Sequence, residues 1–444
     1  MIPVLDKFSL EVAFDLIPTT PDEVTRAIDR AAAYTPLPPP DRAAALRRAR
    51  DILAARRDEM RDAMVTEAGF PLRDAEGEIA RALATLALSA EEATRITGQM
   101  VPFDGAIAGR IGFTLRVPVG IVVAITPFNA PLNTPCHKVG PALAAGNAVI
   151  LKPSERTPTP ARLLGEVLVE AGFPPEAIQV LQGGPDVAQA LLADPRPAFY
   201  AFTGSTAAGT AIQRAAGLRR TQMELGSIAS TIVLADADLD AAVARCVGAS
   251  FRKAGQVCTS IQTLYIEQAA ATAFTDAYVA AAERMVAGDP RDPTSDVGPM
   301  ISVAAAERVE AMLKGARILT GGTRDRAVLT PTVIADPTDA FLTAEAFGPV
   351  AAIIPVDGLD DAMARINTTP YGLATGLFTR SLDAAFRAAK TIHVGGVHIN
   401  ETSSSRVDLM PYGGTKASGF GREGPAYAVC EMTEERLVTF SGLA

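Results

Sequence analysis

Short apolar runs alternate with longer stretches of helical periodicity from Gly120 onward. Each run has four to six residues and is bounded by glycine, proline or polar residues, which is typical of buried strands. Helix-like stretches of about a dozen residues lie between the runs, and this alternation predicts βαβ units and parallel sheets. The strands expected from this pattern are 121–125, 148–151, 178–181, 199–202, 222–225, 231–234, 263–266, 350–355, 373–378 and 396–399. The sequence therefore predicts an α/β fold with two αβ domains that join near Gly226.

The first hundred residues show mainly helical periodicity. Ile79, Leu83 and Leu86 follow one another at i, i+4 and i+7, so they share one face of a helix. The segment 35–40 contains four prolines in six residues, which predicts a loop because successive prolines are incompatible with a helix interior or a central strand.

Composition narrows the class of protein. The 444 residues are too many for one ordinary core, and a content of 48% hydrophobic and 20% charged residues is that of a globular protein. A net charge of −9 argues against a nucleic-acid partner. The N-terminus lacks the pattern of a secretory signal, and no uninterrupted apolar run is long enough to span a membrane. Four scattered cysteines favour a reducing cytoplasm, and the three histidines have no metal-site spacing.

Two glycine-containing segments are candidate phosphate sites. The segment 202–209 follows a predicted strand and opens a helix, where free backbone N–H groups attract an anion and Gly204 allows close approach. An ordinary βα turn explains this segment equally well. The segment 419–424 reads GxGxxG, but it lies about twenty residues from the C-terminus, so no βαβ unit can follow it. We interpret it as a glycine-rich turn.

Lys152 to Glu155 follow another predicted strand, at the sheet edge where a nucleotide would lie. Glu155 would accept hydrogen bonds from ribose hydroxyls and repel a 2′-phosphate, which favours NAD over NADP. NADP remains an alternative because Lys152 can also meet a phosphate, and a simple surface loop is a third interpretation.

Three side chains are candidates for covalent chemistry. Cys258 lies among small and polar residues, unlike Cys246 on its apolar helix, and a nucleophilic cysteine needs such access. Glu224 ends a predicted strand, where it would activate water if burial raises its pKa. Asn129 ends the first strand of the series, where its amide can donate to an oxyanion. A buried structural cysteine, a capping carboxylate and a turn-forming asparagine are the simpler alternatives.

Taken together, these segments resemble the aldehyde dehydrogenase superfamily from about Pro21 to the C-terminus. The matching motifs, in the order in which the family has them, are 126–129, 151–158, 202–209, 224–226, 255–258, 345–350 and 411–414.

The resemblance implies a role for particular residues. Cys258 matches the nucleophile, Glu224 the general base, and Asn129 with the backbone N–H of Cys258 the oxyanion hole. Lys138 matches a family lysine near the active site. The implied cofactor contacts are Thr126, Pro127, Phe128, Lys152, Ser154, Glu155, Gly184, Phe202, Thr203, Gly204, Ser205, Leu225, Gly226, Glu345 and Phe347. Among these, Lys152 and Glu155 match the adenosine-ribose contacts, Ser205 the pyrophosphate contact, and Glu345 and Phe347 the contacts to the nicotinamide ribose and ring.

The family architecture also implies three parts. A Rossmann-like NAD-binding domain is expected from 1–99 and 119–226, a catalytic domain from 227–417, and an oligomerisation arm from 100–118 and 418–444. A homodimer or homotetramer is the family norm. The N-terminal segment is short, which argues against the edge strands that the family usually has there.

The implied reaction is the oxidation of an aldehyde to its acid. The thiolate of Cys258 attacks the aldehyde, NAD accepts a hydride, and Glu224 activates the water that hydrolyses the thioester. Two departures from the family stand out: Ser227 replaces a glycine, where its side chain would narrow the cofactor or water path, and Thr263 stands where arginine is frequent.

The segment 400–412 resembles the branch that contains lactaldehyde and phosphonoacetaldehyde dehydrogenases. By this resemblance Arg406 and His137 fall at substrate-pocket positions, with Arg252 near the same wall. We therefore expect a small polar or anionic aldehyde bound by Arg406. A salt bridge from Arg406 that fixes loops is equally compatible. Val257 argues against a phosphonate, because some phosphonoacetaldehyde enzymes carry arginine there.

Two other functions are compatible with the chain. A CoA-acylating member of the family would pass the acyl group to CoA, but such enzymes commonly lack the glutamate that Glu224 matches. A non-catalytic structural protein of this fold would not need Cys258, Glu224 and Asn129 together.

Overall fold

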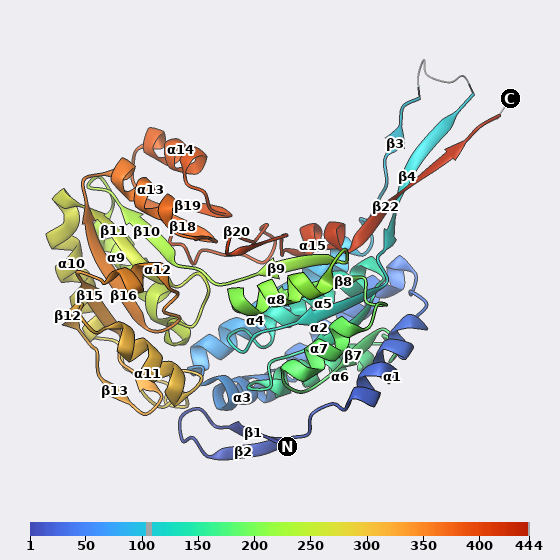
Figure 1. The fold of residues 1–444 in the computed structure, drawn as a ribbon, viewed down its shortest axis with the longest axis horizontal. Helices are drawn as coiled ribbons and strands as arrows, with labels where there is room; N and C mark the ends of the chain where they lie inside the picture. The colour runs from blue at the N-terminus through green and yellow to red at the C-terminus, as the bar shows by residue number, and fades with distance from the viewer. Residues whose placement is uncertain (104–108, 443–444) are drawn as a thin grey trace.

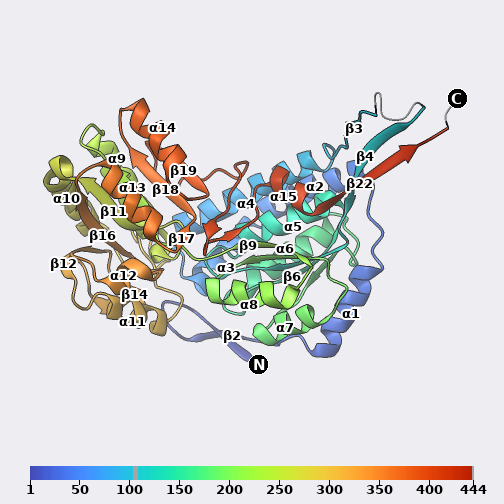
Figure 2. The same ribbon diagram turned by 45° about the horizontal axis from the view of Figure 1, so that its top comes forward.

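The computed structural model describes residues 1–103 and 109–442. It consists of two αβ lobes that lie side by side, and a narrow three-stranded sheet that projects from one of them (Figure 1). A second view, turned by 45°, shows the same arrangement (Figure 2). The predicted α/β class with parallel sheets is confirmed. None of the helices in these two ranges is long and apolar enough to cross a membrane.

The first lobe is built on a six-stranded sheet in the order β21-β9-β8-β5-β6-β7. All neighbours are parallel except β21, which is antiparallel to β9. The strands are β5 (Ile121–Ile125), β6 (Ala148–Lys152), β7 (Ile178–Val180), β8 (Phe199–Thr203), β9 (Arg220–Glu224) and β21 (Gly419–Phe420). The helices are α1 (Pro21–Ala32), α2 (Pro39–Ala55), α3 (Arg57–Ala68), α4 (Leu72–Glu92), α5 (Asn133–Ala145), α6 (Pro158–Glu170), α7 (Pro185–Ala193), α8 (Thr206–Ala216) and α15 (Pro425–Glu431).

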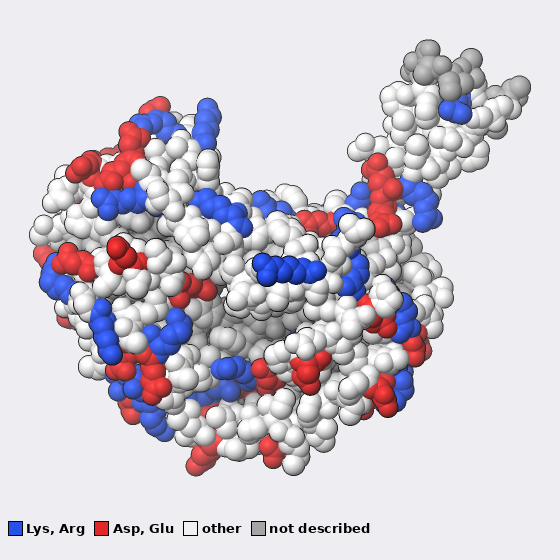
Figure 3. Space-filling view, viewed as in Figure 1, with Lys and Arg blue, Asp and Glu red and all other residues white. Residues whose placement is uncertain are grey.

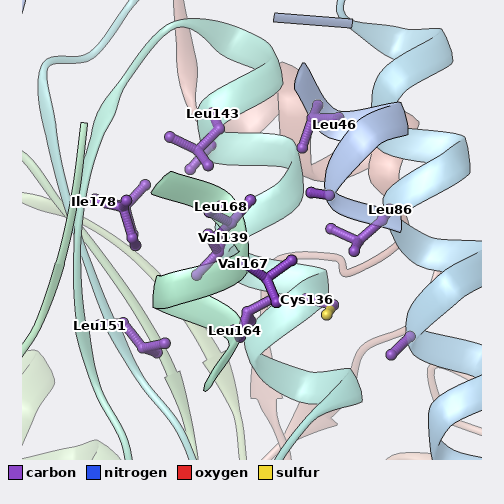
Figure 4. Close-up of a cluster of buried hydrophobic side chains, with 14 of the residues drawn as sticks. Leu46, Leu86, Cys136, Val139, Leu143, Leu151, Leu164, Val167, Leu168 and Ile178 are labelled. Atoms are coloured by element: carbon purple, nitrogen blue, oxygen red, sulfur yellow. The ribbon is translucent and has the colours of Figure 1, made fainter. Parts of the chain in front are cut away.

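Both faces of this sheet are buried, which explains why its strands are uniformly apolar. Val122 and Ala124 of β5 point to the core beneath α2 to α6, whereas Ile121, Val123 and Ile125 point to the core beneath α1, α7 and α8. Figure 4 shows the first of these cores, in which α5 and α6 lie between Leu151 and Ile178 of the sheet on one side and Leu46 and Leu86 of α2 and α4 on the other.

The second lobe contains a seven-stranded sheet in the order β12-β15-β16-β11-β10-β18-β19. Its strands are parallel except β12, which lies antiparallel at one edge. They are β10 (Ala229–Val233), β11 (Ile261–Glu267), β12 (Arg317–Thr320), β15 (Thr332–Ala335), β16 (Val350–Val356), β18 (Ala374–Phe378) and β19 (Gly396–Ile399). The helices around it are α9 (Leu239–Phe251), α10 (Gln268–Glu283), α11 (Val303–Met312), α12 (Asp339–Thr343), α13 (Leu359–Thr368) and α14 (Leu382–Thr391). Two small pairs complete the lobe and its border: β13 (Arg324–Asp325) with β14 (Val328–Leu329), and β17 (Tyr371–Gly372) with β20 (Thr415–Lys416).

The projecting arm is an antiparallel sheet of β3 (Met100–Val101), β4 (Ile111–Pro118) and β22 (Thr433–Phe440). The predicted arm ranges 100–118 and 418–444 include residues 104–108 and 443–444, which lie outside the described residues. Residues 419–420, at the start of the second range, pair with β9 of the first lobe.

Two expectations for the N-terminal region were wrong. Edge strands do form there, because β1 (Ile2–Leu5) and β2 (Val12–Leu16) pair as a hairpin that buries Val4 and Leu16. The proline-rich loop ends earlier than expected, since Pro39 and Pro40 form the first turn of α2. Proline is tolerated at that position because the first helical N–H groups have no partner within the helix.

A short loop ties the second lobe to the first. Residues 252–255 follow α9, and Lys253 and Ala254 adopt positive φ angles of 51° and 53°. The backbone N–H of Lys253 donates to Asp74 on α4 at 2.9 Å, and its ammonium lies 2.6 Å from the Glu78 carboxylate. Both side chains of this pair are buried, so the loop is anchored to the first lobe.

Breaking this buried ion pair is expected to destabilise the protein. Lys253→Met should lower the free energy of unfolding by about 3–5 kcal/mol, because the Glu78 charge would remain buried without its partner. The exposed pair Arg50–Asp51 is the matched control, and Arg50→Met should cost less than about 1 kcal/mol. Equilibrium urea denaturation measures the free energy of unfolding of both variants. An equal loss in the two variants would contradict the importance assigned to the anchored loop.

Candidate active site

A cavity of about 620 Å³ lies between the two lobes. The first lobe contributes the carboxyl ends of β5, β6, β8 and β9, where ligands of parallel sheets bind. The second lobe contributes the segments that precede β11 and β16. Figure 3 shows the surface hollowed between the lobes, with both signs of charge nearby.

Most of the residues singled out from the sequence line this cavity. They are Thr126, Pro127, Phe128, Asn129, Lys152, Ser154, Glu155, Phe202, Thr203, Gly204, Ser205, Glu224, Leu225, Gly226, Arg252, Cys258, Glu345, Phe347 and Arg406. Three others do not line it: Lys138 and His137 lie behind its wall, and Gly184 precedes α7 outside it.

Cys258 is half-buried in the cavity wall, and its Sγ lies 2.8 Å from the Tyr412 hydroxyl. Burial raises the pKa of the thiol to about 11, although the Tyr412 hydrogen bond and the Arg406 charge act to lower it. The free thiol is therefore protonated at neutral pH, and its activation depends on the neighbouring groups.

Glu224 ends β9 and is almost fully buried. Neither of its carboxyl oxygens has a hydrogen-bond partner among the described residues. Burial raises its pKa well above the usual range, and the charge of Glu423 acts in the same direction. A buried carboxyl group without partners is available to a water molecule or a substrate, which is what a general base requires.

Asn129 follows β5, and its side-chain amide donates to the carbonyl oxygen of Gln256 at 2.7 Å. Its own backbone oxygen accepts from the ammonium of Lys253 at 3.2 Å. These contacts fix Asn129 to the loop that carries Cys258. Because an amide group has two N–H donors, one remains for an oxyanion in the cavity.

Lys138 and His137 belong to α5, whose residues are all buried. The ammonium of Lys138 lies 2.9 Å from Oε1 of Glu423, so it acts on the cavity through that carboxylate. His137 Nε2 lies 2.9 Å from Oδ1 of Asp408. The structure thus places His137 behind the pocket wall, contrary to the expectation that it faces the substrate.

Two arginines at the catalytic end of the cavity differ in their partners. The Nη2 atom of Arg406 donates to Oε2 of Glu423 at 2.8 Å, which is the salt-bridge alternative considered from the sequence. The Nη2 atom of Arg252 donates only to the Ser404 hydroxyl at 3.2 Å, and no ion pair is found for it within the described ranges. Burial lowers the pKa of the Arg252 guanidinium, whereas the nearby Asp74 carboxylate acts to raise it.

The far end of the cavity carries the predicted nucleotide residues. Lys152 Nζ donates to the Pro153 carbonyl at 3.1 Å and lies 3.7 Å from Oε2 of Glu155. Ser205 caps α8, with its hydroxyl accepting from Ala208. At Gly204 a Cβ would lie 2.5 Å from the Phe202 ring, so a larger residue at this turn would displace that ring.

Between the two ends, Glu345 and Phe347 approach from the second lobe. Oε1 of Glu345 accepts from the backbone N–H of Ser227 at 2.9 Å, and burial raises the Glu345 pKa to about 7. Phe347 packs edge-on against Phe128 at 5.9 Å between ring centroids. Ser227 is buried beside Glu345, so the departure from the family lies next to the predicted ribose contact.

Sequence reasoning missed Tyr412 and Glu423 as individual functional residues. Tyr412 was noted only within a motif, and Glu423 only within the 419–424 segment. That segment is a turn with positive φ angles at Gly419, Gly421 and Gly424. The signal that could have found Glu423 is Lys138, since a lysine on an apolar helix needs a carboxylate partner. Across the described residues no group of three or more histidine, cysteine, aspartate or glutamate side chains is arranged for a metal.

Comparison with known proteins gives a consistent picture. The profile of the Aldehyde dehydrogenase family matches residues 1–438. The chain is 44% identical to a 3-sulfolactaldehyde dehydrogenase from Priestia aryabhattai, over 99% of this chain and 94% of the relative. It is 35% identical to a lactaldehyde dehydrogenase from Methanocaldococcus jannaschii, over 99% and 97% of the two chains.

Solved structures agree with this assignment. Glyceraldehyde-3-phosphate dehydrogenase GapN from Methanocaldococcus jannaschii, complexed with NADP, has a TM-score of 0.96 and 34% identity, covering 100% of this chain and 99% of its own. Aldehyde dehydrogenase 21 from Physcomitrella patens, in complex with the reaction product succinate, has a TM-score of 0.95 and 34% identity, covering 100% and 95%.

Proposed function

This chain belongs to the aldehyde dehydrogenase family, and we propose that it oxidises a small anionic aldehyde to the carboxylic acid through a thioester on Cys258. The observation that carries the proposal is one cavity that holds Cys258, Glu224 and Asn129 at one end and the nucleotide-binding turns at the other. A nucleophile, a base and an oxyanion donor so placed form the constellation that acyl chemistry requires.

The cavity fits a nicotinamide dinucleotide. Its volume lies within the range of cofactor sites, and Gly204 and Ser205 present the start of α8 to a pyrophosphate. Lys152 and Glu155 would hold the adenosine ribose, and Glu345 the nicotinamide ribose. The bound cofactor would supply the acceptor for the hydride that leaves the substrate carbon. We propose NAD as the preferred form because Glu155 stands where a 2′-phosphate would lie, with NADP as the alternative that Lys152 supports.

The chain's own residues account for the remaining steps. The sulfur of Cys258 bonds to the aldehyde carbon, and the free N–H of Asn129 with the backbone N–H of Cys258 stabilises the negative oxygen. After oxidation, Glu224 accepts a proton from water as the water oxygen bonds to the acyl carbon. The carbon–sulfur bond then breaks and the thiol of Cys258 re-forms.

Arg252 is the residue that we propose to bind the anionic part of the substrate. It is half-buried and has no carboxylate partner among the described residues, whereas the charge of Arg406 is already paired with Glu423. A guanidinium in this state favours a carboxylate or sulfonate. The relatives named for 3-sulfolactaldehyde and lactaldehyde, and the neighbour with bound succinate, support a small polar or anionic aldehyde.

We also propose that the enzyme is a homodimer or homotetramer. The arm exposes apolar side chains on all three strands, namely Met100, Ile111, Leu115, Leu437 and Phe440. Much of its surface in Figure 3 carries no charge. Such a surface favours contact with a second copy of the chain.

The location is a separate proposal. All four cysteines are free, which supports a reducing, cytoplasmic location. Cell fractionation that recovers the protein in the secreted fraction would contradict this location.

The oxidation is tested by mixing the protein with small aldehydes and NAD or NADP and recording the reduced nicotinamide. Glu224→Gln should give a burst of about one equivalent per subunit and then a steady rate lower by about a hundredfold or more, because hydrolysis loses its base. The exposed Glu11→Gln is the control and should match the parent. Steady turnover that requires CoA, or an unaffected rate in Glu224→Gln, would contradict hydrolysis by Glu224.

Anion binding is tested with Arg252→Met. KM for an anionic aldehyde should rise by about 10- to 100-fold, because one hydrogen bond to a charged group contributes that much to binding. KM for a neutral aldehyde of similar size should change by less than about twofold. Arg245→Met on the same segment, which removes an exposed partner of Glu401, is the control. An equal change in KM for both aldehydes would show that Arg252 does not bind the charged group of the substrate.

The assembly is tested by sedimentation velocity. The parent should sediment as a dimer or tetramer, and Leu437→Asp, which places a charge on the arm, should shift the population towards monomer. A monomeric parent at concentrations of roughly tens of micromolar would contradict the assignment of the arm to oligomerisation.

A further inference from the structure

Tyr412 forms a side-chain hydrogen bond with the nucleophile, with 2.8 Å between its hydroxyl and Cys258 Sγ. Resting on the proposed function, we propose that Tyr412 is a further catalytic residue: its hydroxyl donates a hydrogen bond to the sulfur and stabilises the thiolate before attack. In the same proposal Arg406 is a positioning residue that acts on the sulfur through the Tyr412 ring.

The direction of this hydrogen bond follows from the chemistry of the two groups. A thiolate has no proton to donate, so in the reactive form only the phenol can be the donor. Burial raises the pKa of Tyr412 well above its usual value, so the phenol keeps its proton throughout neutral pH. Both side chains line the same cavity, where the contact is removed from bulk water and is therefore stronger.

Arg406 makes this phenol a better donor. Its guanidinium carbon lies 3.7 Å from the centroid of the Tyr412 ring, which is a close cation–π contact. A cation on the ring face draws electron density from the phenol and strengthens its O–H as a hydrogen-bond donor. The Nε atom of Arg406 is buried without a hydrogen-bond partner in the described part of the chain, so the Tyr412 ring and the Glu423 carboxylate are the main contacts of the guanidinium.

Glu423 holds the arginine in place. Its two oxygens receive Arg406 at 2.8 Å and Lys138 at 2.9 Å, so both are occupied. The result is a continuous chain of contacts from the buried Lys138 and Glu423 through Arg406 and Tyr412 to Cys258. This chain gives Arg406 a role other than the substrate binding expected from the sequence.

The other charged groups around the sulfur make a donor necessary. Glu224 from the end of β9 and Glu345 from the segment before β16 both disfavour a thiolate, whereas Arg406 favours it. The guanidinium of Arg252, at the end of α9, also attracts the charge of a Cys258 thiolate. Burial opposes the thiolate more than any of these groups, so the hydroxyl at 2.8 Å is the main local compensation.

The step balances without a further reactant. The proton of the Cys258 thiol passes to solvent water, as the one proton that the overall oxidation releases, and the sulfur electron pair forms the bond to the aldehyde carbon. The carbonyl π pair moves to the aldehyde oxygen, and the side-chain N–H of Asn129 donates a hydrogen bond to that oxygen. The Tyr412 proton stays on its own oxygen, and its hydrogen bond weakens as charge leaves the sulfur.

The test follows the alkylation of Cys258 by iodoacetamide against pH without substrate, with the modified peptide measured by mass spectrometry. Cys430→Ser serves as the parent background because Cys430 is the exposed cysteine. Tyr412→Phe should move the midpoint up by about one pH unit and slow alkylation below the midpoint by about tenfold. Arg406→Met should shift it in the same direction, and Arg406→Lys should restore part of the shift.

Tyr427→Phe is the control, because Tyr427 is exposed and its loss should leave the profile unchanged. A Tyr412→Phe alkylation profile that superimposes on that of the parent would overturn the proposal. This holds even if turnover falls, because the hydroxyl would then contact the substrate and would not stabilise the thiolate. If Tyr412→Phe fails to fold, site-specific 3,5-difluorotyrosine at 412 replaces it. This more acidic phenol should lower the midpoint, and an unchanged midpoint would again overturn the proposal. Turnover that survives Cys258→Ala would instead refute the proposed function.

Discussion

The buried contact between Lys253 and Glu78 is the constraint on which the rest of the active site depends. Cys258 belongs to the second lobe, whereas Glu224 and Asn129 end strands of the first. Their cooperation therefore requires that the loop before Cys258 be fixed to the other lobe. Lys253 does this twice, with its ammonium between Glu78 and the Asn129 carbonyl and its backbone N–H on Asp74. Left-handed backbone at Lys253, Ala254 and Gly255 turns the chain sharply enough to make these contacts and then to present the cysteine.

The same cavity separates two buried carboxylates into different roles. Burial acts to raise the pKa of both Glu423 and Glu224, but Lys138 and Arg406 outweigh it at Glu423, whose pKa falls far below the usual range. Glu224 has no hydrogen bond to those cations among the described residues and keeps a pKa well above the usual range. Neighbouring carboxyl groups whose environments push their pKa values apart are the usual sign of divided labour. Glu423 holds the side chains of Lys138 and Arg406 in place, and Glu224 remains available for proton transfer.

Sequence patterns predicted the parallel core because its strands are buried on both faces and read as continuous apolar runs. The ten expected strands correspond to β5 to β11, β16, β18 and β19 with ends that differ by a residue or two. The edge strand β12 and its neighbour β15 were missed, since Arg317–Thr320 is half-exposed and β15 follows Pro331. Cys258, Glu224 and Asn129 were identified because each is a reactive residue type at a recognisable place on the sheet or in a motif. The Lys138–Glu423 pair joins residues 285 positions apart, and no local pattern encodes such a contact. For the same reason, the placement of His137 behind the wall and the pairing of Arg406 emerged only from the folded chain.

The account stands on covalent chemistry at one sulfur, so the most direct test is to observe the acyl group on it. Glu224→Gln enzyme is mixed with an aldehyde substrate and cofactor, quenched in acid within the first turnover, digested and measured by mass spectrometry. The account predicts the mass of the acyl group on the peptide that contains Cys258, and unmodified Cys136, Cys246 and Cys430. Formation of reduced cofactor in that turnover with no acyl group on Cys258 would contradict it.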